Sequence, residues 1–420
     1  MTVLAVRPLA APPDVGITVP GSKSITNRAL VVAALAAGRS DLSKVLISDD
    51  TDAMLRSLRR LGLRAEADIP ACRVEVDGWD GCVPPGPATI DVRQAGTAAR
   101  FLPPLLALGQ GTYTVDGSSQ MRSRPVADLV AALRELGVHV KGDGLPLEVV
   151  ATGGVRGGQV TVGGSATSQF LSGLLLSGPY FSEGLDLVAE GHTVSRPYLA
   201  ITVATMASFG VHVEVEDGRR FRVSPGQCYS GTRFAVEPDA SAACNFFAVA
   251  AITGGRVRVN GLSRNSVQGD LRFVDVLARM GAEVRRTDGF IEVVGHPLTG
   301  VEEDLADFSD AAPTLAVTAA FASTPTRITG IGFIRRKESD RVGNVVSELR
   351  RCGIEADEEP DGMVIHPGNP RPAVVQTYDD HRMAMAFSLL GLVADGIAIA
   401  DPSCVAKTFP DFFATLDRLR

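Results

Sequence analysis

Cysteine is scarce in this sequence, and its few copies follow no disulfide or metal-binding pattern. The 420 residues contain 6 cysteines, with no CxxC pair and no histidine at zinc-finger spacing from a cysteine. Disulfide-rich secreted domains and structural zinc sites both depend on such spacings. We therefore expect no disulfide framework and no structural zinc, and a location in the reducing cytoplasm. The rest of the sequence has no ligand spacing either, so we expect no metal or organic cofactor.

Excess positive charge and long apolar runs are also missing. The formal net charge is −7, which argues against a general attraction to nucleic acid or to an acidic membrane surface. No apolar run reaches the roughly eighteen residues that a membrane-spanning helix needs, and the first residues lack the pattern of an export signal. We expect neither nucleic acid nor membrane as a partner, so any basic cluster must be a local site.

Small and aliphatic residues, in contrast, are abundant. Hydrophobic types make up 45% of the sequence and charged types 21%, and there are 44 glycines. This is the composition of an ordinary globular protein rather than of a disordered one. A chain of this length is expected to form two or three domains, each with its own core.

A helix-like phrase that ends at a glycine recurs along the chain. Its copies are MLRSLRRLGLRAE, LVAALRELGVHVK, ITVATMASFGVHVE, FVDVLARMGAEVR and VVSELRRCGIEAD, and a sixth, FFATLDRLR, ends at Arg420. The marker glycines lie 71 to 75 residues apart, at Gly62, Gly137, Gly210, Gly281 and Gly353. Apolar residues at helical spacing, then glycine, then an alternating pattern predict an amphipathic helix, a left-handed cap and a strand.

A second phrase alternates with the first and consists of a polar lead-in followed by an almost wholly apolar helix. Its copies include SKSITNRALVVAALAAG, QAGTAARFLPPLLALGQG, DASAACNFFAVAAITGG and DDHRMAMAFSLLGLVADG. Together the two phrases define six repeats of roughly 72 residues. A helix that is apolar all round belongs in the interior, so we expect buried helices with sheets outside them.

The polar lead-ins indicate what the buried helices could bind. A helix N-terminus has free N–H groups and the positive end of the helix dipole, and Lys23, Ser24 and Arg28 would add side-chain donors there. Other lead-ins carry related chemistry, at Gly96 to Arg100, Ser168 to Gln169, Asp310, and Asp380 to Arg382. If the six N-termini point the same way, these groups converge on a pocket for a ligand with several phosphate or carboxylate groups.

Taken alone, each of these motifs has a simpler structural interpretation. GSKS lacks the GxxxxGK[ST] spacing of a phosphate loop, and an isolated arginine is usually a solvated charge on a helix face. The segment KESDR at 337 to 341 is typical of an exposed helix start with Ser339 capping nearby, and His381 of a structural histidine. Recurrence at equivalent places in the repeats favours the functional interpretation.

A set of longer motifs resembles one known family. PGSKSITNRAL, QAGTAAR, SRPV, TSQFLSGLL, SRPYL, SDAAPTL, RRKESDRV, YDDHRMAMAFSLL and KTFPDFF occur in this order between about residues 7 and 417. They are similar to the motifs of the 5-enolpyruvylshikimate-3-phosphate synthases. The resemblance implies an α/β fold of two similar lobes, each of three βαβαββ repeats around buried parallel helices, an inside-out α/β barrel of the enolpyruvyl transferase type. It places the first lobe at 20–235, the second at 1–19 and 236–420, and the active site in the cleft between them.

The resemblance also implies an activity and a set of site residues. The family transfers the enolpyruvyl group of phosphoenolpyruvate to the 5-hydroxyl of shikimate 3-phosphate through a tetrahedral intermediate, releasing phosphate. It implies that the catalytic residues are Asp310, Glu338 and Lys23. Phosphoenolpyruvate would be held by Lys23, Gly96, Arg124, Gln169, Arg341, Arg382 and Lys407, and shikimate 3-phosphate by Lys23, Ser24, Arg28, Thr167, Ser168, Gln169, Ser195, Tyr198, Asp310 and Lys337. Inhibition by glyphosate, which mimics phosphoenolpyruvate, and a monomeric state are the further expectations.

The sequence departs from the family's usual motifs in two places. Where many relatives read NAGTAMRP, this chain has Gln94, Ala99 and Phe101, so the helix behind Gly96 is expected to be placed slightly differently. Thr167 replaces the first serine of a common SSQ pattern, which keeps a hydroxyl group and adds a methyl group.

Two alternative functions stay open. A sister enolpyruvyl transferase acts on UDP-N-acetylglucosamine and normally uses a cysteine close to an Arg-Pro step, but the corresponding DGSSQMRSRPV contains none. The other alternative is a non-catalytic, anion-binding scaffold built from the same repeats. The joint presence of Asp310, Glu338, Lys23 and Lys407 argues against it, and turnover is the test.

Overall fold

The chain folds into two compact units of mixed α/β structure. The computed structural model describes residues 2–163, 167–191 and 194–420. The continuous unit is Gly21–Val236, and the discontinuous unit combines Met1–Pro20 with Glu237–Arg420. The predicted fold class is confirmed in its main features, because each unit contains three helix-and-sheet repeats.

The continuous unit repeats one order of elements three times: a buried helix, a strand, a second helix and a run of strands. Its first repeat is α1 (Lys23–Leu35), β3 (Arg39–Ser43), α2 (Asp49–Arg60), β4 (Arg64–Asp68), β5 (Arg73–Asp77) and β6 (Ala88–Asp91). Its second is α3 (Gly96–Leu106), β7 (Gln110–Asp116), α4 (Ser119–Arg122), α5 (Ala127–Glu135), β8 (His139–Lys141), β9 (Leu147–Thr152) and β10 (Gly158–Gly163). Its third is α6 (Gln169–Ser177), β11 (Leu185–Glu190), α7 (Pro197–Ser208), β12 (Glu214–Glu216), β13 (Arg220–Val223) and β14 (Arg233–Ala235), with the short helix η1 (Gly178–Tyr180) after α6.

The discontinuous unit has the same order, with its last strands supplied by the start of the chain. Its first repeat is α8 (Ala240–Thr253), β15 (Arg256–Asn260), η2 (Gly269–Arg272), α9 (Phe273–Met280), β16 (Glu283–Arg286), β17 (Phe290–Val294) and β18 (Glu302–Asp304). Its second is η3 (Ser309–Ala311), α10 (Ala312–Ala319), β19 (Thr326–Thr329), η4 (Gly332–Arg336), α11 (Arg341–Arg351), β20 (Ala356–Glu359), β21 (Gly362–Ile365) and β22 (Ala373–Val375). The third is α12 (His381–Val393), β23 (Ile397–Ala400), η5 (Pro402–Lys407) and α13 (Phe412–Asp417), joined by β1 (Val3–Ala5) and β2 (Asp14–Ile17).

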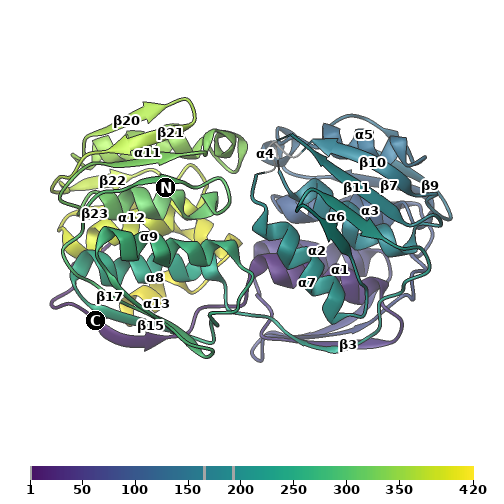
Figure 1. Cartoon of the computed structure of the whole chain (residues 1–420), viewed down its shortest axis with the longest axis horizontal. Coiled ribbons are helices and arrows are strands. Elements are labelled where there is room, and N and C mark those ends of the chain that lie inside the picture. Colours follow the sequence, from purple (N-terminus) through teal and green to yellow (C-terminus); the bar gives the residue numbers. More distant parts are fainter. Residues whose placement is uncertain (1, 164–166, 192–193) are drawn as a thin grey trace. The chain divides into compact units, whose positions relative to one another are not determined.

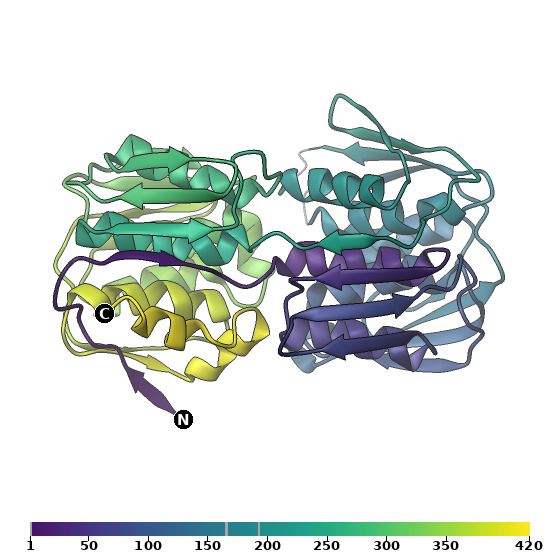
Figure 2. The same cartoon turned by 90° about the horizontal axis from the view of Figure 1, so that it is seen from below.

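Each unit has three small sheets. In the continuous unit their strand orders are β14-β3-β5-β4, β6-β7-β9-β8 and β10-β11-β13-β12, and in the discontinuous unit β16-β17-β15-β2, β18-β19-β21-β20 and β1-β23-β22. Two strands pair far from their neighbours in sequence: β2 runs parallel to β15, and β14 runs parallel to β3 (Figure 2). Among the described residues no sheet closes on itself, so the helices are enclosed by open sheets rather than by a continuous barrel.

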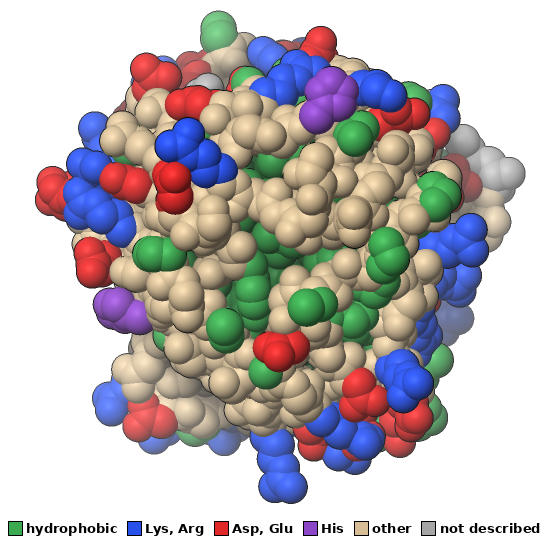
Figure 3. All heavy atoms as spheres, turned by 90° about the vertical axis from the view of Figure 1, so that its right-hand side faces the viewer, with side chains coloured by type: hydrophobic (Ala, Val, Ile, Leu, Met, Phe, Trp, Pro, Cys, Tyr) green, Lys and Arg blue, Asp and Glu red, His purple; other side chains and the backbone are tan. Residues whose placement is uncertain are grey.

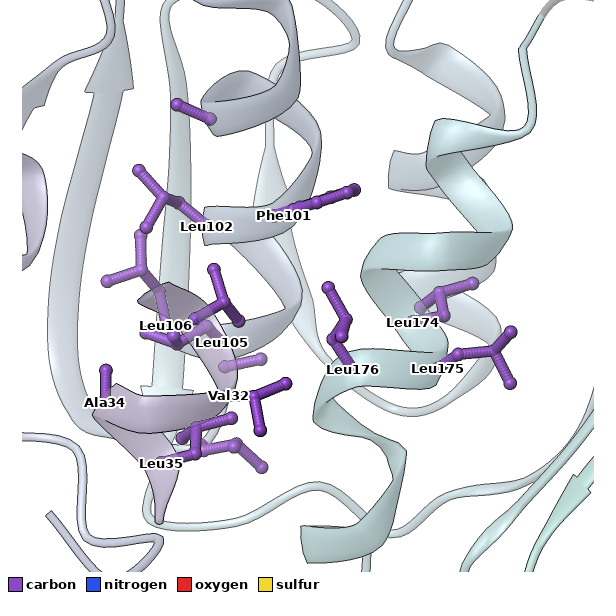
Figure 4. Close-up of a cluster of buried hydrophobic side chains, with 14 of the residues drawn as sticks. Val32, Ala34, Leu35, Phe101, Leu102, Leu105, Leu106, Leu174, Leu175 and Leu176 are labelled. Carbon is purple, nitrogen blue, oxygen red and sulfur yellow. The ribbon is translucent and has the colours of Figure 1, made fainter. Parts of the chain in front are cut away.

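The predicted interior helices are confirmed. Every residue of α1 from Ile25 to Leu35 is buried, and so is every residue of α3. In Figure 1 the helices of each unit lie inside and its strands run along the outside. Figure 4 shows Val32 and Leu35 of α1, Leu105 and Leu106 of α3 and Leu176 of α6 in one apolar cluster of the continuous unit. Burial of such side chains stabilises a fold by about 1.5 to 3 kcal/mol each.

The outer helices and strands also follow the predicted pattern. In α2 the buried side chains include Ala53, Met54 and Leu58, which share one face. The five marker glycines that follow these helices all have φ between 79° and 122°, the region where glycine avoids the strain of a side chain. Strand β5 buries Val74 and Val76 and turns its charged residues outward.

Most charged side chains on one face of the continuous unit lie around the margin. Figure 3 shows mainly hydrophobic and other uncharged atoms, with one acidic side chain, in the middle of this face, and Lys and Arg near its edge. A polyanion is attracted by clustered positive charge, which the middle of this face lacks. The middle of this face therefore does not contain the cationic residues predicted to bind substrate. Of these, Lys23, Arg28 and Arg382 lie on buried helices.

Candidate active site

Arg28 contacts all three buried helices of the continuous unit. Arg28 is the sixth residue of α1, and its guanidinium carbon lies 5.1 Å from the ring centre of Phe101, the sixth residue of α3. The same guanidinium donates to Ser172 Oγ, in the first turn of α6, at 3.0 Å. Because Arg28 also donates to Ser24 O, its guanidinium lies beside the first turns of α1 and α6 and against the middle of α3. The positive ends of the α1 and α6 dipoles are therefore close together.

Close packing of α3 against α6 depends on a glycine. A Cβ atom added at Gly173 would lie 2.4 Å from the carbonyl oxygen of Arg100. No real Cβ approaches an oxygen that closely, so only glycine allows the two helix starts to touch at this point.

Arg28 is almost completely buried and is held by uncharged oxygens. Its Nε donates to Thr202 Oγ1 at 2.7 Å, its Nη1 to Ser24 O at 2.9 Å and its Nη2 to Tyr198 O at 3.1 Å, in addition to Ser172. Only 2% of Arg28 is exposed, and burial lowers its pKa to about 10. In the described part of the chain no carboxylate pairs with it. Such a cation gains strongly from an anionic ligand.

Lys23 stands at the start of the same helix. It is the first residue of α1, and its Nζ lies 3.3 Å from Asp50 Oδ2 in α2. Asp50 belongs to the acidic first turn of α2, where negative charge is favoured by the helix dipole. The contact orients the Lys23 ammonium at the same end of α1 as Arg28.

Gly96 and Arg124 are brought into contact at the start of α3. A Cβ at Gly96 would lie 2.7 Å from Arg124 Nη1 and 3.0 Å from its Nη2. Arg100, one turn further along α3, donates to Gly96 O at 3.2 Å and to Pro125 O at 2.6 Å, which fastens the Arg124 segment to the helix. The guanidinium of Arg124 therefore lies over the helix N-terminus, an arrangement suited to a phosphate or carboxylate.

The predicted shikimate phosphate residues of the third repeat begin α6 and α7. Thr167 Oγ1 accepts a hydrogen bond from the backbone N–H of Gln169 at 3.2 Å, and Ser168 is buried. Ser195 has a left-handed φ of 56° and accepts from the N–H of Tyr198, whose ring centre lies 6.0 Å from the Arg28 guanidinium. Residues 164–166, which precede TSQ, and His192 and Thr193 lie outside the described residues.

The buried helices of the discontinuous unit meet near their N-termini. Thr314, the third residue of α10, donates to Asn245 Oδ1, on the sixth residue of α8, at 3.1 Å. Asp310, just before α10, accepts from Nη2 of Arg382, the second residue of α12, at 2.7 Å. Side-chain contacts therefore join the three buried helices in both units, but with different residues.

Arg341 is the centre of the charged cluster in this unit. Its side chain is 1% exposed and bonds to three carboxylates. Its Nη1 donates to Asp310 Oδ1 at 2.9 Å and its Nη2 to Glu338 Oε2 at 2.8 Å. Its Nε and Nη2 both reach Asp380, at 2.8 and 3.1 Å. These carboxylates raise the pKa of Arg341 although burial opposes them.

Asp310 in turn accepts from three cations. Besides Arg341 and Arg382, the Nζ of Lys337 donates to its Oδ1 at 3.1 Å. Burial lowers the pKa of Lys337, and Asp310 partly counteracts this. A carboxylate surrounded by cationic donors is held in one orientation, which a group that exchanges a proton with a substrate requires.

The remaining predicted residues of this unit lie in or beside the same elements. His381 and Arg382 open α12, and both are buried. Lys407 is the buried last residue of η5, which packs against α12. The KESDR segment differs from its simpler interpretation: Asp340, not Ser339, caps α11 by accepting from Val342 N and Gly343 N, and Arg341 is buried rather than exposed.

Sequence reasoning missed several residues that complete the site. Ser172 lies in a buried apolar helix and Thr202 in a copy of the amphipathic phrase, and both accept hydrogen bonds from Arg28. Asp50 lies in the acidic first turn of α2 and contacts Lys23, and Asp380 caps α12 and contacts Arg341. A hydroxyl or carboxylate on an otherwise apolar, buried helix was the one available signal, because buried polar groups must find partners.

Metal-binding clusters and membrane-spanning helices are both absent from the described residues. Within residues 2–163, 167–191 and 194–420, no three or more His, Cys, Asp or Glu side chains are grouped as a metal site would need. Over the same residues the structure has no helix with the length and hydropathy required to span a membrane.

The fold is first of all that of the enolpyruvyl transferases. The enolpyruvyl transferase NikO from Streptomyces tendae has the same fold, with a TM-score of 0.78 at 19% identity, covering 99% of this chain and 97% of that one. The structure of EPSP synthase from Acinetobacter baumannii is more similar, with a TM-score of 0.85 at 25% identity over 100% of this chain and 98% of that one.

Within this class the chain belongs to the EPSP synthase family. The model of the family EPSP synthase (3-phosphoshikimate 1-carboxyvinyltransferase) matches residues 13–416. The 3-phosphoshikimate 1-carboxyvinyltransferase of Trichormus variabilis is 43% identical over 418 residues, covering 98% of each chain. That of Shewanella denitrificans is 43% identical over 425 residues, covering 100% of this chain and 99% of its own.

Proposed function

We propose that this protein is a transferase that moves the enolpyruvyl group of phosphoenolpyruvate to the 5-hydroxyl of shikimate 3-phosphate and releases phosphate. The reaction belongs to the shikimate pathway of aromatic amino-acid biosynthesis. The observation that carries the proposal is the family match over residues 13–416. Both substrates are small polyanions, and the buried cations at the helix starts of each unit suit such ligands.

The proposed reaction proceeds by addition and then elimination. The 5-hydroxyl oxygen bonds to C2 of phosphoenolpyruvate, loses its proton to a base, and the methylene carbon C3 gains a proton from an acid. In the second half, the C2–O bond to phosphate breaks as C3 gives up a proton, which restores the double bond. Protons and leaving group balance without a redox partner.

Three residues are assigned to this proton transfer. Asp310 is proposed as the base, because its carboxylate is oriented by Lys337, Arg341 and Arg382. Glu338 is proposed to exchange the proton at C3, and it is held by Arg341. Lys23 is proposed to neutralise developing charge and to share in proton transfer.

The binding roles are divided between the two ligands. For phosphoenolpyruvate the proposed residues are Lys23, Gly96, Arg124, Gln169, Arg341, Arg382 and Lys407. For shikimate 3-phosphate they are Lys23, Ser24, Arg28, Thr167, Ser168, Gln169, Ser195, Tyr198, Asp310 and Lys337. Support for the second group is strongest at Arg28, whose buried charge is met only by neutral oxygens in the described structure.

The test is phosphate release from phosphoenolpyruvate. We expect release with shikimate 3-phosphate and none with UDP-N-acetylglucosamine; the reverse pattern would identify the sister activity, and silence with both would indicate a non-catalytic scaffold. Glyphosate is expected to compete with phosphoenolpyruvate. A monomer by light scattering and a cytoplasmic location are proposed as well.

A single substitution tests the assignment of Glu338. Glu338→Gln is expected to bind both substrates and to lose kcat by about 100-fold or more, because an amide cannot exchange the proton. Ligand titration measures binding and phosphate release measures kcat. A near-normal kcat would remove Glu338 from the catalytic group.

A further inference from the structure

The acidic residue within α11, Glu348, lies two helical turns beyond Arg341. Glu348 follows Arg341 by seven residues, a spacing that puts both side chains on one face of a helix. The Glu348 side chain is 0% exposed, although a carboxylate is rarely buried without dedicated partners. The groups that donate hydrogen bonds to the Glu348 carboxylate therefore indicate its role.

Glu348 holds the segment that connects β22 to α12. Its Oε2 accepts from the backbone N–H of Gln376 at 3.0 Å, and its Oε1 accepts from the hydroxyl of Tyr378 at 2.8 Å. A third bond comes from Arg351 Nε at 2.9 Å, on the same helix. Two of the three bonds thus fix the connecting segment, while the third stays within α11.

The connecting segment contains a turn that its own residues disfavour. Asp380 N donates to Thr377 O at 2.9 Å, which closes a four-residue turn. Its two central residues, Tyr378 and Asp379, have φ of 54° and 55°. Turns with two left-handed residues normally use Asn-Gly or Gly-Gly, because other side chains are strained there. Contacts from outside the turn must hold this conformation.

The turn ends at the residue that organises the proposed site. Asp380 accepts from Arg382 N at the start of α12, from Arg341, and from Ser339 Oγ at 3.0 Å. A change in the turn would move the Asp380 carboxylate, and with it the guanidinium of Arg341. It would also shift the start of α12, where Arg382 stands.

We propose that Glu348 is a positioning residue for the active site: it clamps the strained Thr377–Asp380 turn onto α11, so that Asp380 meets Arg341 in one geometry. Helix α11 then grips the connection at two points on one face, with Arg341 at the proposed site and Glu348 two turns away. This role rests on the proposed function, because Arg341 and Arg382 are assigned to phosphoenolpyruvate.

Substitution of Glu348 provides the test, with a matched control on the same helix. Glu348→Gln leaves one acceptor oxygen for three donors, and we expect kcat/KM for phosphoenolpyruvate to fall about tenfold or more. Arg351→Gln removes only the bond within α11, from a side chain that is 48% exposed, and is expected to change kcat/KM by less than about twofold. Equal effects of the two substitutions would overturn the proposal.

A rescue experiment separates positioning from general loss of stability. Asp379→Gly places at the turn a residue that accepts a left-handed φ without strain. In this background Glu348→Gln is expected to lower kcat/KM by less than about threefold, since the turn no longer needs the clamp. The same tenfold loss with and without glycine would refute the role of the turn. Thermal unfolding of wild type, Glu348→Gln, Asp379→Gly and the double variant shows whether the recovery of kcat/KM reflects a recovery of stability instead.

A milder variant covers the case in which Glu348→Gln does not fold. Tyr378→Phe removes one clamp bond from an exposed side chain, and kcat/KM is expected to fall about threefold. No change relative to wild type would count against the clamp. If wild-type protein itself fails to release phosphate, the proposed function fails, and the effect of Glu348 is then measured on phosphoenolpyruvate binding by titration.

Discussion

Two buried arginines, one in each unit, have opposite surroundings. Arg28 in the continuous unit is 2% exposed and is held by hydroxyl and carbonyl oxygens. Arg341 in the discontinuous unit is 1% exposed and is held by three carboxylates. Burial lowers the pKa of Arg28 to about 10, whereas the carboxylates raise the pKa of Arg341.

The difference assigns different tasks to two chemically identical side chains. In the described structure the charge of Arg28 is not balanced by an acid, so an anionic ligand is the partner that would compensate it. The charge of Arg341 is already balanced, so besides its proposed contact with phosphoenolpyruvate its guanidinium orients Asp310, Glu338 and Asp380. One arginine is suited to recognition, and the other organises the groups proposed for proton transfer.

Removal of Arg341 is expected to have the largest effect. Arg341→Met leaves three carboxylates without their shared cation, which should lower the free energy of unfolding by about 3 to 5 kcal/mol and abolish turnover. Denaturant unfolding measures the loss, and Arg351→Met is the control because that arginine is half-exposed on the same helix. A loss below about 1 kcal/mol, as for a surface ion pair, would contradict the comparison.

Removal of Arg28 should affect binding far more than stability. Arg28→Gln keeps donors for Ser172 and Thr202 while deleting a buried charge, so the free energy of unfolding should change by less than about 2 kcal/mol. The Kd for shikimate 3-phosphate should rise about 100-fold. Calorimetric titration checks this, with the exposed Arg56→Gln as control. Unchanged affinity would show that Arg28 is only structural.

The pH dependence of the free energy of unfolding tests the comparison at a buried carboxylate, Asp270. Burial, and then Asp310, raise its pKa from 3.8 to about 6. Because the folded protein binds this proton more tightly than the unfolded chain, the free energy of unfolding should fall as pH rises from about 4 to 6, by at most about 3 kcal/mol. Asp270→Asn should remove this fall and be relatively more stable at pH 8. The exposed Asp275→Asn is the control, and identical pH curves for wild type and Asp270→Asn would refute the assignment.

Substitution of Gly96, in the continuous unit, has the smallest expected effect of the four predictions. The Cβ of Gly96→Ala would meet the Arg124 guanidinium at 2.7 Å and displace it. The KM for phosphoenolpyruvate should rise about tenfold, and that for shikimate 3-phosphate should change less than about twofold. Gly144→Ala, where a Cβ meets nothing within 4 Å, is the control. Equal changes in both KM values would argue against a specific role for Arg124.

The repeat pattern allowed the elements to be predicted because it rests on local rules. Gly62 and Gly353 mark helix ends in the sequence and have the left-handed φ expected there. The apolar phrase beginning at Ser22 predicted an interior helix, and α1 is buried from Ile25 to Leu35. Helical spacing and backbone conformation are properties of a few neighbouring residues, so they can be read without coordinates.

The contacts of the candidate site could not be predicted from the sequence in the same way. Asp380 lies 39 residues from Arg341, and Thr202 lies 174 residues from Arg28, yet both pairs are hydrogen-bonded. The cap at Asp340 rather than Ser339 also depends on where the Ser339 hydroxyl finds Asp380. Nothing local distinguishes these partners from other serines, threonines and aspartates of the chain.

The amino-acid order was therefore enough to specify six repeats, their inner and outer helices and a set of charged helix starts, because periodicity and capping act over a few residues. Which buried cation is neutralised and which is left for a ligand was decided only by tertiary structure. Desolvation and pairing depend on distances in space, and the fold brings three carboxylates to Arg341 and none of the described ones to Arg28.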